Sequence, residues 1–176
     1  MITRFGLAPR LPGLSIPAFQ HHWREIHGPI IGVLPGIRRY WQNHAIPEAL
    51  PWPGFDACSE FDAEDMAAFD AMFSTEHYLT EGQADERRFV DRSRGGAVFA
   101  RRIGETVPLL DGHVRMLSFL RGDPSVLAEA LAQPERGGAA AAREAFARIP
   151  EVPGVFDAVE VLWFADPAAA LAHLSS

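Results

Sequence analysis

The pattern of apolar residues after Ser15 predicts an amphipathic helix near the start of the chain. Apolar side chains recur there every three to four residues, at Phe19, Trp23, Ile26 and Ile30. Ser15 is suited to cap the helix, and Pro17 lies in the first turn, where its missing N–H has no cost. The Gly28-Pro29 pair should kink or end this helix, because proline removes a hydrogen bond and clashes with the preceding turn.

Short apolar segments alternate with helical ones through the first 104 residues. Strands are predicted over Ile2–Pro9, Ile37–Ile46, Phe55–Phe61 and Ala97–Ile103. Asp62 is suited to cap a second helix that begins near Ala63. Pro47–Gly54 is expected to form a loop, and the charged segment Gly82–Gly96 to wrap the surface. The order is β-α-β-β-α-β, which is that of a ferredoxin-like unit.

In the second half, a strand is predicted over His113–Arg121 and a helix after Asp123. Apolar residues at Leu127, Leu131, Ala142, Phe146 and Ile149 have helical spacing. Two helical pieces, broken at Pro134–Gly138, are therefore expected before the final helix Pro167–Leu174.

The two halves share a short repeated pattern. A Phe-Asp-Ala triplet begins at Phe55 and again at Phe156, and each precedes a strand and then an alanine-rich helix. We expect a ferredoxin-like unit over residues 1–105 and a shortened, degenerate second copy over residues 112–176. The second copy would lack the last strand of the unit. For one of its two hairpin strands, the sequence shows no matching apolar segment.

A ferredoxin-like sheet carries helices on one face, so its other face needs cover. Two such sheets packed face to face enclose a barrel-like cavity, and the partner sheet could come from the second half or from a second chain. The predicted fold class is α+β, with sheets packed as a dimeric or pseudodimeric α+β barrel. The space between the sheets would suit a small, mostly apolar ligand.

All 16 basic residues are arginine, and the absence of lysine narrows the possible chemistry. Schiff-base catalysis, pyridoxal-phosphate attachment and a lysine-bearing phosphate loop are excluded. The net charge of −7 argues against a nucleic-acid partner, and the lone Cys58 excludes an intrachain disulfide. No apolar run is long enough to span a bilayer, and the N-terminus does not resemble a signal peptide. A cytoplasmic protein without a membrane partner is expected.

His27 is the first candidate for chemistry, because it directly precedes the helix-breaking Gly28-Pro29 pair. A kink there could turn the imidazole toward the cavity, where it would accept and return a proton. The alternative is a structural role, in which His27 caps the helix or bonds a loop carbonyl. Trp23, one turn earlier, is expected in the core or in a pocket wall.

Tyr40 is the second candidate, since its hydroxyl could polarise a substrate carbonyl from a strand. The alternative is a core tyrosine whose hydroxyl is satisfied at the sheet edge. Alternation along the strand predicts two sets of side chains on opposite faces: Tyr40, Gln42 and His44 on one, and Trp41 and Asn43 on the other. Gln42 and His44 would orient the substrate.

Motifs for metals and nucleotides are absent from the sequence. His22 and His27 are five residues apart, which is a poor spacing for one metal ion, and no HExxH, CxxC or Gly-rich dinucleotide loop occurs. No metal site and no cofactor are predicted, although a single axial histidine would suffice for haem. Asp85-Glu86-Arg87-Arg88 is expected on a solvated face, and Arg38 or Arg39 is expected to contact an anionic ligand.

The segment from Phe19 to Asn43 resembles the EthD family of dimeric α+β barrel proteins. The family pattern has an aromatic residue, Trp and His-x-Pro at the end of the first helix, and then Pro-Gly-x-x-x-Tyr on the next strand. This sequence has the family pattern at Phe19, Trp23, His27, Pro29, Pro35, Gly36, Tyr40, Gln42 and Asn43. The resemblance extends over residues 1–104, and the second half has no counterpart of the Trp, His and Tyr positions.

The resemblance implies a homodimer with a small apolar or aromatic metabolite as its ligand. Relatives on this fold include isomerases, cyclases, dehydratases and monooxygenases. We expect cofactor-free isomerisation, cyclisation or dehydration of a small cyclic or aromatic metabolite, with His27 as acid or base and Tyr40 as hydrogen-bond donor. The substrate would be bound by Trp23, Arg39, Gln42, Asn43 and His44. The alternatives are a non-catalytic ligand-binding or accessory protein, and a haem-dependent or cofactor-free monooxygenase.

Overall fold

The computed structural model describes residues 1–46, 54–133 and 138–175, which divide into two compact units. Among these residues, the first unit comprises 1–45 and 54–97. The second unit comprises Ile46 together with 98–133 and 138–175. The predicted loop Pro47–Gly54 and the predicted helix break Pro134–Gly138 lie almost wholly outside the described residues. Within the described ranges, no helix combines the length and apolar character needed to cross a membrane.

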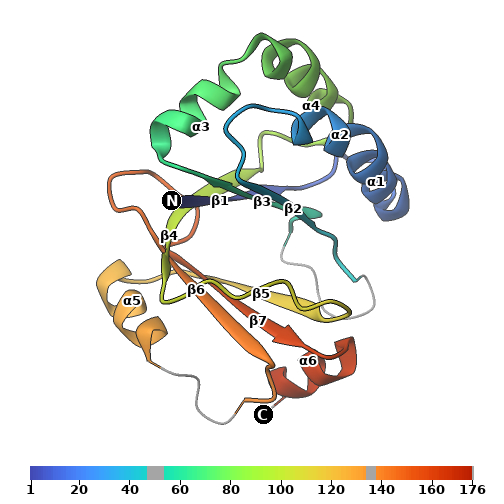
Figure 1. Ribbon diagram of the computed structural model, residues 1–176. Coiled ribbons are helices and arrows are strands. Elements are labelled where there is room, and N and C mark those ends of the chain that lie inside the picture. Colours follow the sequence, from blue (N-terminus) through green and yellow to red (C-terminus); the bar gives the residue numbers. More distant parts are fainter. Residues whose placement is uncertain (47–53, 134–137, 176) are drawn as a thin grey trace. The chain divides into compact units, whose positions relative to one another are not determined.

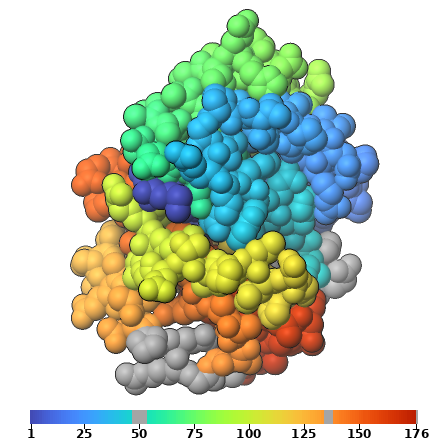
Figure 2. All heavy atoms as spheres, in the orientation of Figure 1, coloured from blue at the N-terminus to red at the C-terminus, as the bar shows by residue number. Residues whose placement is uncertain are grey.

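The first unit is an antiparallel sheet that carries helices on one face (Figure 1). Its elements are β1 (Ile2–Ala8), α1 (Ile16–His22), η1 (Trp23–His27), α2 (Gly28–Gly32), β2 (Arg39–Asn43), β3 (Ala57–Ala63), α3 (Met66–Phe73), η2 (Tyr78–Gly82) and α4 (Gln83–Phe89). Strand β3 lies between β2 and β1 and pairs with both. The helical segments are contiguous on the outer surface of this unit (Figure 2).

The helix-facing side of this sheet combines large and small side chains. Arg4 of β1 and Tyr40 of β2 are both paired with Phe61 of β3, so the three residues share one face. Two residues further along the strands, Gly6 is paired with Ser59. These small residues leave space beneath the helices, whereas Phe61 and Tyr40 stack with ring centroids 4.6 Å apart.

The first helix continues through Gly28-Pro29, where the sequence predicts a kink or an end. Residues Trp23–His27 form a π-helical turn, and the N–H of Gly28 donates to the carbonyl of Trp23, five residues earlier. The amide of Gln42 donates to the same carbonyl at 2.8 Å. A Cβ at position 28 would lie only 2.8 Å from Gln42 Nε2, so glycine makes room for this contact. The helix thus accommodates the proline through a π turn, a distortion that often occurs at functional sites.

Asp62 is part of β3 and does not cap a helix, which corrects the predicted start of the second helix. Strand pairing extends past this residue, and its side chain accepts a hydrogen bond from Thr3 Oγ1 at 2.6 Å. It also lies 2.8 Å from Nε of Arg39, on the face opposite the helices. Asp65 caps α3 instead, with its carboxylate accepting from the N–H of Ala68.

Asp62→Ala is expected to destabilise the protein more than Asp65→Ala. Loss of the exposed cap costs about 1 kcal/mol of unfolding free energy. Removal of the buried Asp62 deprives Arg39 of one of its two carboxylates and costs about 3 kcal/mol. Urea unfolding of both variants beside the wild type measures the difference. An equal loss in the two variants would contradict a structural role for the buried pair.

The second unit contains most of β4 (Gly96–Ile103), followed by β5 (Val114–Leu120), α5 (Pro124–Ala132), β6 (Ala142–Arg148), β7 (Ala158–Phe164) and α6 (Pro167–Leu174). Its strands pair antiparallel in the order β4-β6-β7-β5. Helix α5 packs near Ala158, and His173 of α6 contacts Phe164 with ring centroids 5.3 Å apart. Ala158 and Phe164 have the same parity along β7, so both helices cover one face of this sheet.

The predicted helix over Ala142–Ile149 is wrong, because Ala142–Arg148 form strand β6. Residues four apart share a face in a strand as well as in a helix, so the spacing of Ala142 and Phe146 fits both structures. Ala145 and Phe146 are both buried, as expected for a strand covered on both faces. The second unit therefore has both hairpin strands of the β-α-β-β-α order.

The segment Gly82–Gly96, which the sequence predicts to wrap the surface, forms helix α4 over its first half. Asp85 and Phe89 are four residues apart on the inner side of this helix and are only 3% and 2% exposed. Arg87 and Arg88 are exposed. The expected solvated face is thus correct for the two arginines and wrong for Asp85.

Candidate functional site

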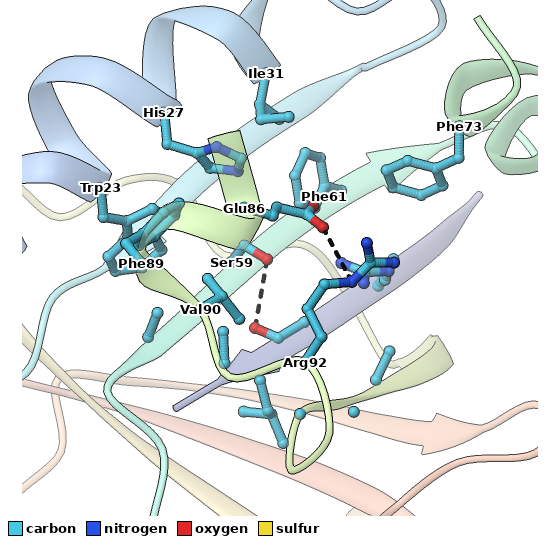
Figure 3. Close-up of a pocket in the computed structure, with 18 of the residues that line it drawn as sticks. Trp23, His27, Ile31, Ser59, Phe61, Phe73, Glu86, Phe89, Val90 and Arg92 are labelled. Carbon is cyan, nitrogen blue, oxygen red and sulfur yellow. Dashed lines mark hydrogen bonds and ion pairs between the residues drawn. The ribbon is translucent and has the colours of Figure 1, made fainter. Parts of the chain in front are cut away.

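A pocket of about 360 Å³ lies in the first unit, between the helices and the sheet (Figure 3). His27 and Ile31 line its helical wall, and Tyr40 and Phe61 line its strand wall. The volume is near the lower end of the range for small-molecule sites, about 300–1,000 Å³. The sequence predicts a cavity on the opposite face of the sheet. That cavity stays a prediction, and the small side chains of β1 and β3 place the present pocket under the helices.

A buried carboxylate holds His27 in the pocket wall. Its Nδ1 lies 3.0 Å from Asp85 Oδ2, and His27 is 7% exposed. His22 Nε2 lies 2.9 and 3.1 Å from the two oxygens of the same carboxylate. A carboxylate only accepts hydrogen bonds, so Nδ1 of His27 carries the proton and Nε2 is the nitrogen left for a ligand. The ring of Phe89, with its centroid 5.0 Å away, packs against the imidazole.

The protonation of His27 follows from its burial. Burial lowers the pKa of His27, and the hydrogen bond and charge of Asp85, with the charge of Glu86, oppose this shift without outweighing it. The neutral ring is therefore the main form near pH 7. A neutral imidazole with an available Nε2 can act as a base.

The hydroxyl of Tyr40 belongs to a short hydrogen-bond chain. Gln42 Nε2 donates to Tyr40 Oη at 2.8 Å, and His44 Nε2 lies 3.1 Å from Gln42 Oε1. These contacts confirm the predicted alternation along the strand. Because Gln42 donates to the phenolic oxygen, the phenolic hydrogen is available for a ligand. Burial raises the pKa of Tyr40 to about 12, which keeps that hydrogen in place.

Trp23 and His44 support this chain. Trp23 lines the pocket and is 3% exposed, and its ring centroid lies 4.6 Å from that of His44. His44 Nδ1 contacts Gln20 Oε1. Burial, aided by the charge of Arg24, lowers the pKa of His44 to about 4. His44 is a positioning group, because it contacts Gln42 and does not line the pocket.

Arg39 and Asn43, expected near the substrate, lie on the face of the sheet away from the pocket. Arg39 pairs with Glu60 Oε1 at 2.8 Å and stacks over Trp41, with Cζ 4.1 Å from the ring centroid. Asn43 Nδ2 donates to the carbonyl of Cys58 at 3.1 Å. These two side chains therefore do not join His27 and Tyr40.

Asp85 was missed because its charged neighbours in the sequence indicate a solvated segment. The spacing of Gly82, Asp85 and Phe89 at three and four residues was the available signal for a buried helix face. A buried carboxylate on that face requires hydrogen-bond partners, and His22 and His27 supply them.

A second polar group in the pocket was also missed, and it consists of Arg4, Tyr78, Glu86 and Arg92. Tyr78 Oη donates to Glu86 Oε1 at 3.0 Å, and Arg92 Nε lies 3.6 Å from Glu86 Oε2. Arg4 stacks over Phe73, with Cζ 5.2 Å from the ring centroid. Burial, with a smaller effect from Glu86, raises the pKa of Tyr78 to about 12.

Within the described residues, no cluster of three or more His, Cys, Asp or Glu side chains suits a metal ion.

The sequence matches the EthD domain family over residues 11–93. A similar solved structure is an EthD (ethyl tert-butyl ether D) family protein from Bacillus halodurans, at 18% identity and a TM-score of 0.47. That likeness covers 61% of this chain and 100% of the other. Among curated proteins, none matches the sequence.

Two further solved structures are similar over almost the whole chain. A candidate monooxygenase from Lactobacillus acidophilus has a TM-score of 0.59 at 11% identity, covering 99% of this chain and 81% of its own. A candidate chlorite dismutase has a TM-score of 0.52 at 12% identity, with 99% and 84% covered. Likeness at this level of identity shows the fold. The predicted α+β, ferredoxin-like class is thereby confirmed.

Proposed function

We propose that the segment which matches the EthD domain family, residues 11–93, catalyses cofactor-free proton transfer on a small cyclic or aromatic metabolite. The proposal is carried by the buried His27–Asp85 contact of 3.0 Å in the wall of the pocket. A neutral imidazole whose Nδ1–H is held by a carboxylate presents Nε2 as a general base. Tyr40, on the strand wall of the same pocket, supplies a hydrogen-bond donor.

In the proposed reaction, Nε2 of His27 removes a proton from an acidic carbon of the ligand. The electron pair moves toward an adjacent carbonyl oxygen, where the hydroxyl of Tyr40 stabilises the negative charge. Asp85 stabilises the imidazolium that forms. Return of the proton to a second carbon completes an isomerisation, and its transfer to a departing hydroxyl releases water in a dehydration. Neither outcome needs an oxidant or a reductant.

Hydrogen–deuterium exchange tests this proposal without knowledge of the natural product. Single-ring ketones and unsaturated lactones whose carbon acids exchange slowly unaided are incubated with the protein in D₂O. We expect deuterium at one carbon, faster than in buffer, by ¹H NMR and mass spectrometry. Compounds that raise the melting temperature but never exchange would contradict catalysis and support the ligand-binding alternative.

The exchange rate should fall on the acid side with a midpoint below pH 6.5, the ordinary value for histidine. His27 must be neutral to accept a proton, and burial lowers its pKa, so the active form persists to more acidic pH. Tyr40, with a pKa of about 12, should add no alkaline loss up to about pH 10. The profile of kcat/KM from about pH 4 to about pH 10 measures both limbs. An acid midpoint above 6.5 would argue against His27 as the base.

A further inference from the structure

The pocket has a cationic region that the proposed proton transfer does not use. Arg4 of β1 and Arg92, which follows α4, line it together with Glu86. In Figure 3, Arg92 and Phe73 lie on one side of the pocket, and Trp23 and Phe89 lie on the other. Arg4 stacks over Phe73, so both guanidinium groups lie on that side of the pocket.

The charges of the groups that line the pocket do not cancel. Two guanidinium groups, Arg4 and Arg92, line it together with one carboxylate, Glu86, and His27 is neutral near pH 7. The lining groups thus carry one net positive charge, in a protein whose own net charge is −7. The nearby Asp85 carboxylate lies behind His27 and does not line the pocket, so the positive potential is local to Arg4 and Arg92 and favours an anionic group there.

The guanidinium of Arg4 is held in a defined place. It stacks on Phe61 and Phe73, with Cζ 5.8 and 5.2 Å from the ring centroids. The chain has glycine at position 6, beside this group, and a Cβ there would overlap both the guanidinium and the hydroxyl of Ser59. A planar guanidinium in a fixed orientation can bind a carboxylate through two parallel hydrogen bonds.

We propose that the region around Arg4 binds the carboxylate of the ligand, so that the substrates are small ring-bearing monocarboxylic acids. The ring would lie against Trp23 and Phe89, within reach of the base. One net positive charge suits a monoanion better than a phosphate dianion. This inference rests on the proposed function for the role of His27, but the binding of the carboxylate does not depend on turnover.

Calorimetric titration with three probes tests the charge preference in the wild type. The probes are phenylacetate, its neutral isostere phenylacetamide, and the dianion phenyl phosphate. We expect phenylacetate to bind about 10- to 100-fold more tightly than the amide and more tightly than the phosphate. Equal binding of acid and amide, or stronger binding of the phosphate, would overturn the proposal.

Variants assign the preference to Arg4. Arg4→Gln should remove most of the advantage of phenylacetate over the amide and leave the amide affinity unchanged. Gly6→Ala, which displaces the same guanidinium, should have the same effect even if Arg4→Gln fails to fold. Arg38→Gln is the matched control, because Arg38 has a side chain that is 66% exposed and lies outside the pocket. If phenylacetate still binds more tightly than phenylacetamide in both Arg4→Gln and Gly6→Ala, Arg4 is not the carboxylate-binding group.

The calorimetric titrations test the carboxylate site, and the deuterium-exchange assay tests the proposed catalysis, so the two claims can fail independently. If acids bind through Arg4 but no carbon acid exchanges, the carboxylate site stands and the catalytic proposal fails. If neutral ketones exchange while the acid preference is absent, catalysis stands and the carboxylate site is wrong.

Discussion

His27→Gln should lower kcat for deuterium exchange by about 10²- to 10⁴-fold, the usual contribution of a general base. Glutamine can still donate a hydrogen bond to Asp85, so the buried carboxylate keeps a partner. It has no basic nitrogen, so it cannot take a proton from carbon. Ligand affinity, measured by calorimetry on the same sample, should change little, because the base contributes mainly in the transition state.

His21→Ala provides the matched control for this variant. His21 lies on the same helical segment but is exposed, and it does not line the pocket. Its removal should leave kcat and affinity unchanged. Exchange that survives in His27→Gln, or that is lost equally in His21→Ala, would show that His27 is not the base and would favour its structural role.

The elements that depend on local signals could be predicted from the sequence. Ser15 and Asp123 cap α1 and α5, and each side chain accepts from a backbone N–H two or three residues later. The last helix begins at Pro167 as predicted. Capping and proline placement act within one helical turn, so the sequence reveals them without knowledge of the fold.

The site depends on contacts that sequence spacing does not show. His27 and Asp85 are 58 residues apart, and they meet only because η1 and α4 pack on the same side of the sheet. Arg39 has the residue type expected for an anion site, but strand parity turns it away from the pocket. Arg4, whose parity turns it toward the helices, was overlooked because charge on a strand usually indicates exposure. The homodimer, the cytoplasmic location and the domain limits at residues 105 and 112 stay predictions.

Asp85→Asn should lower kcat by about 10²- to 10⁴-fold, although Asp85 itself does not line the pocket. The carboxylate accepts from Nδ1 of His27 and from Nε2 of His22. An asparagine amide placed on Nδ1 would donate instead, which moves the ring proton to Nε2 and blocks the base. Asp85 is thus a positioning residue, and Asp70→Asn, at an exposed site on α3, is its matched control.

Two measurements distinguish this positioning role from simple loss of stability. The ¹⁵N NMR signals of His27 should change from the Nδ1–H to the Nε2–H tautomer in Asp85→Asn. Any residual exchange should also lose activity at a lower pH than in the wild type, because the hydrogen bond and charge of Asp85 raise the pKa of His27. If the folded variant keeps the wild-type kcat, tautomer and acid limb, the buried carboxylate only stabilises the fold. His27 would then need no partner to act as a base.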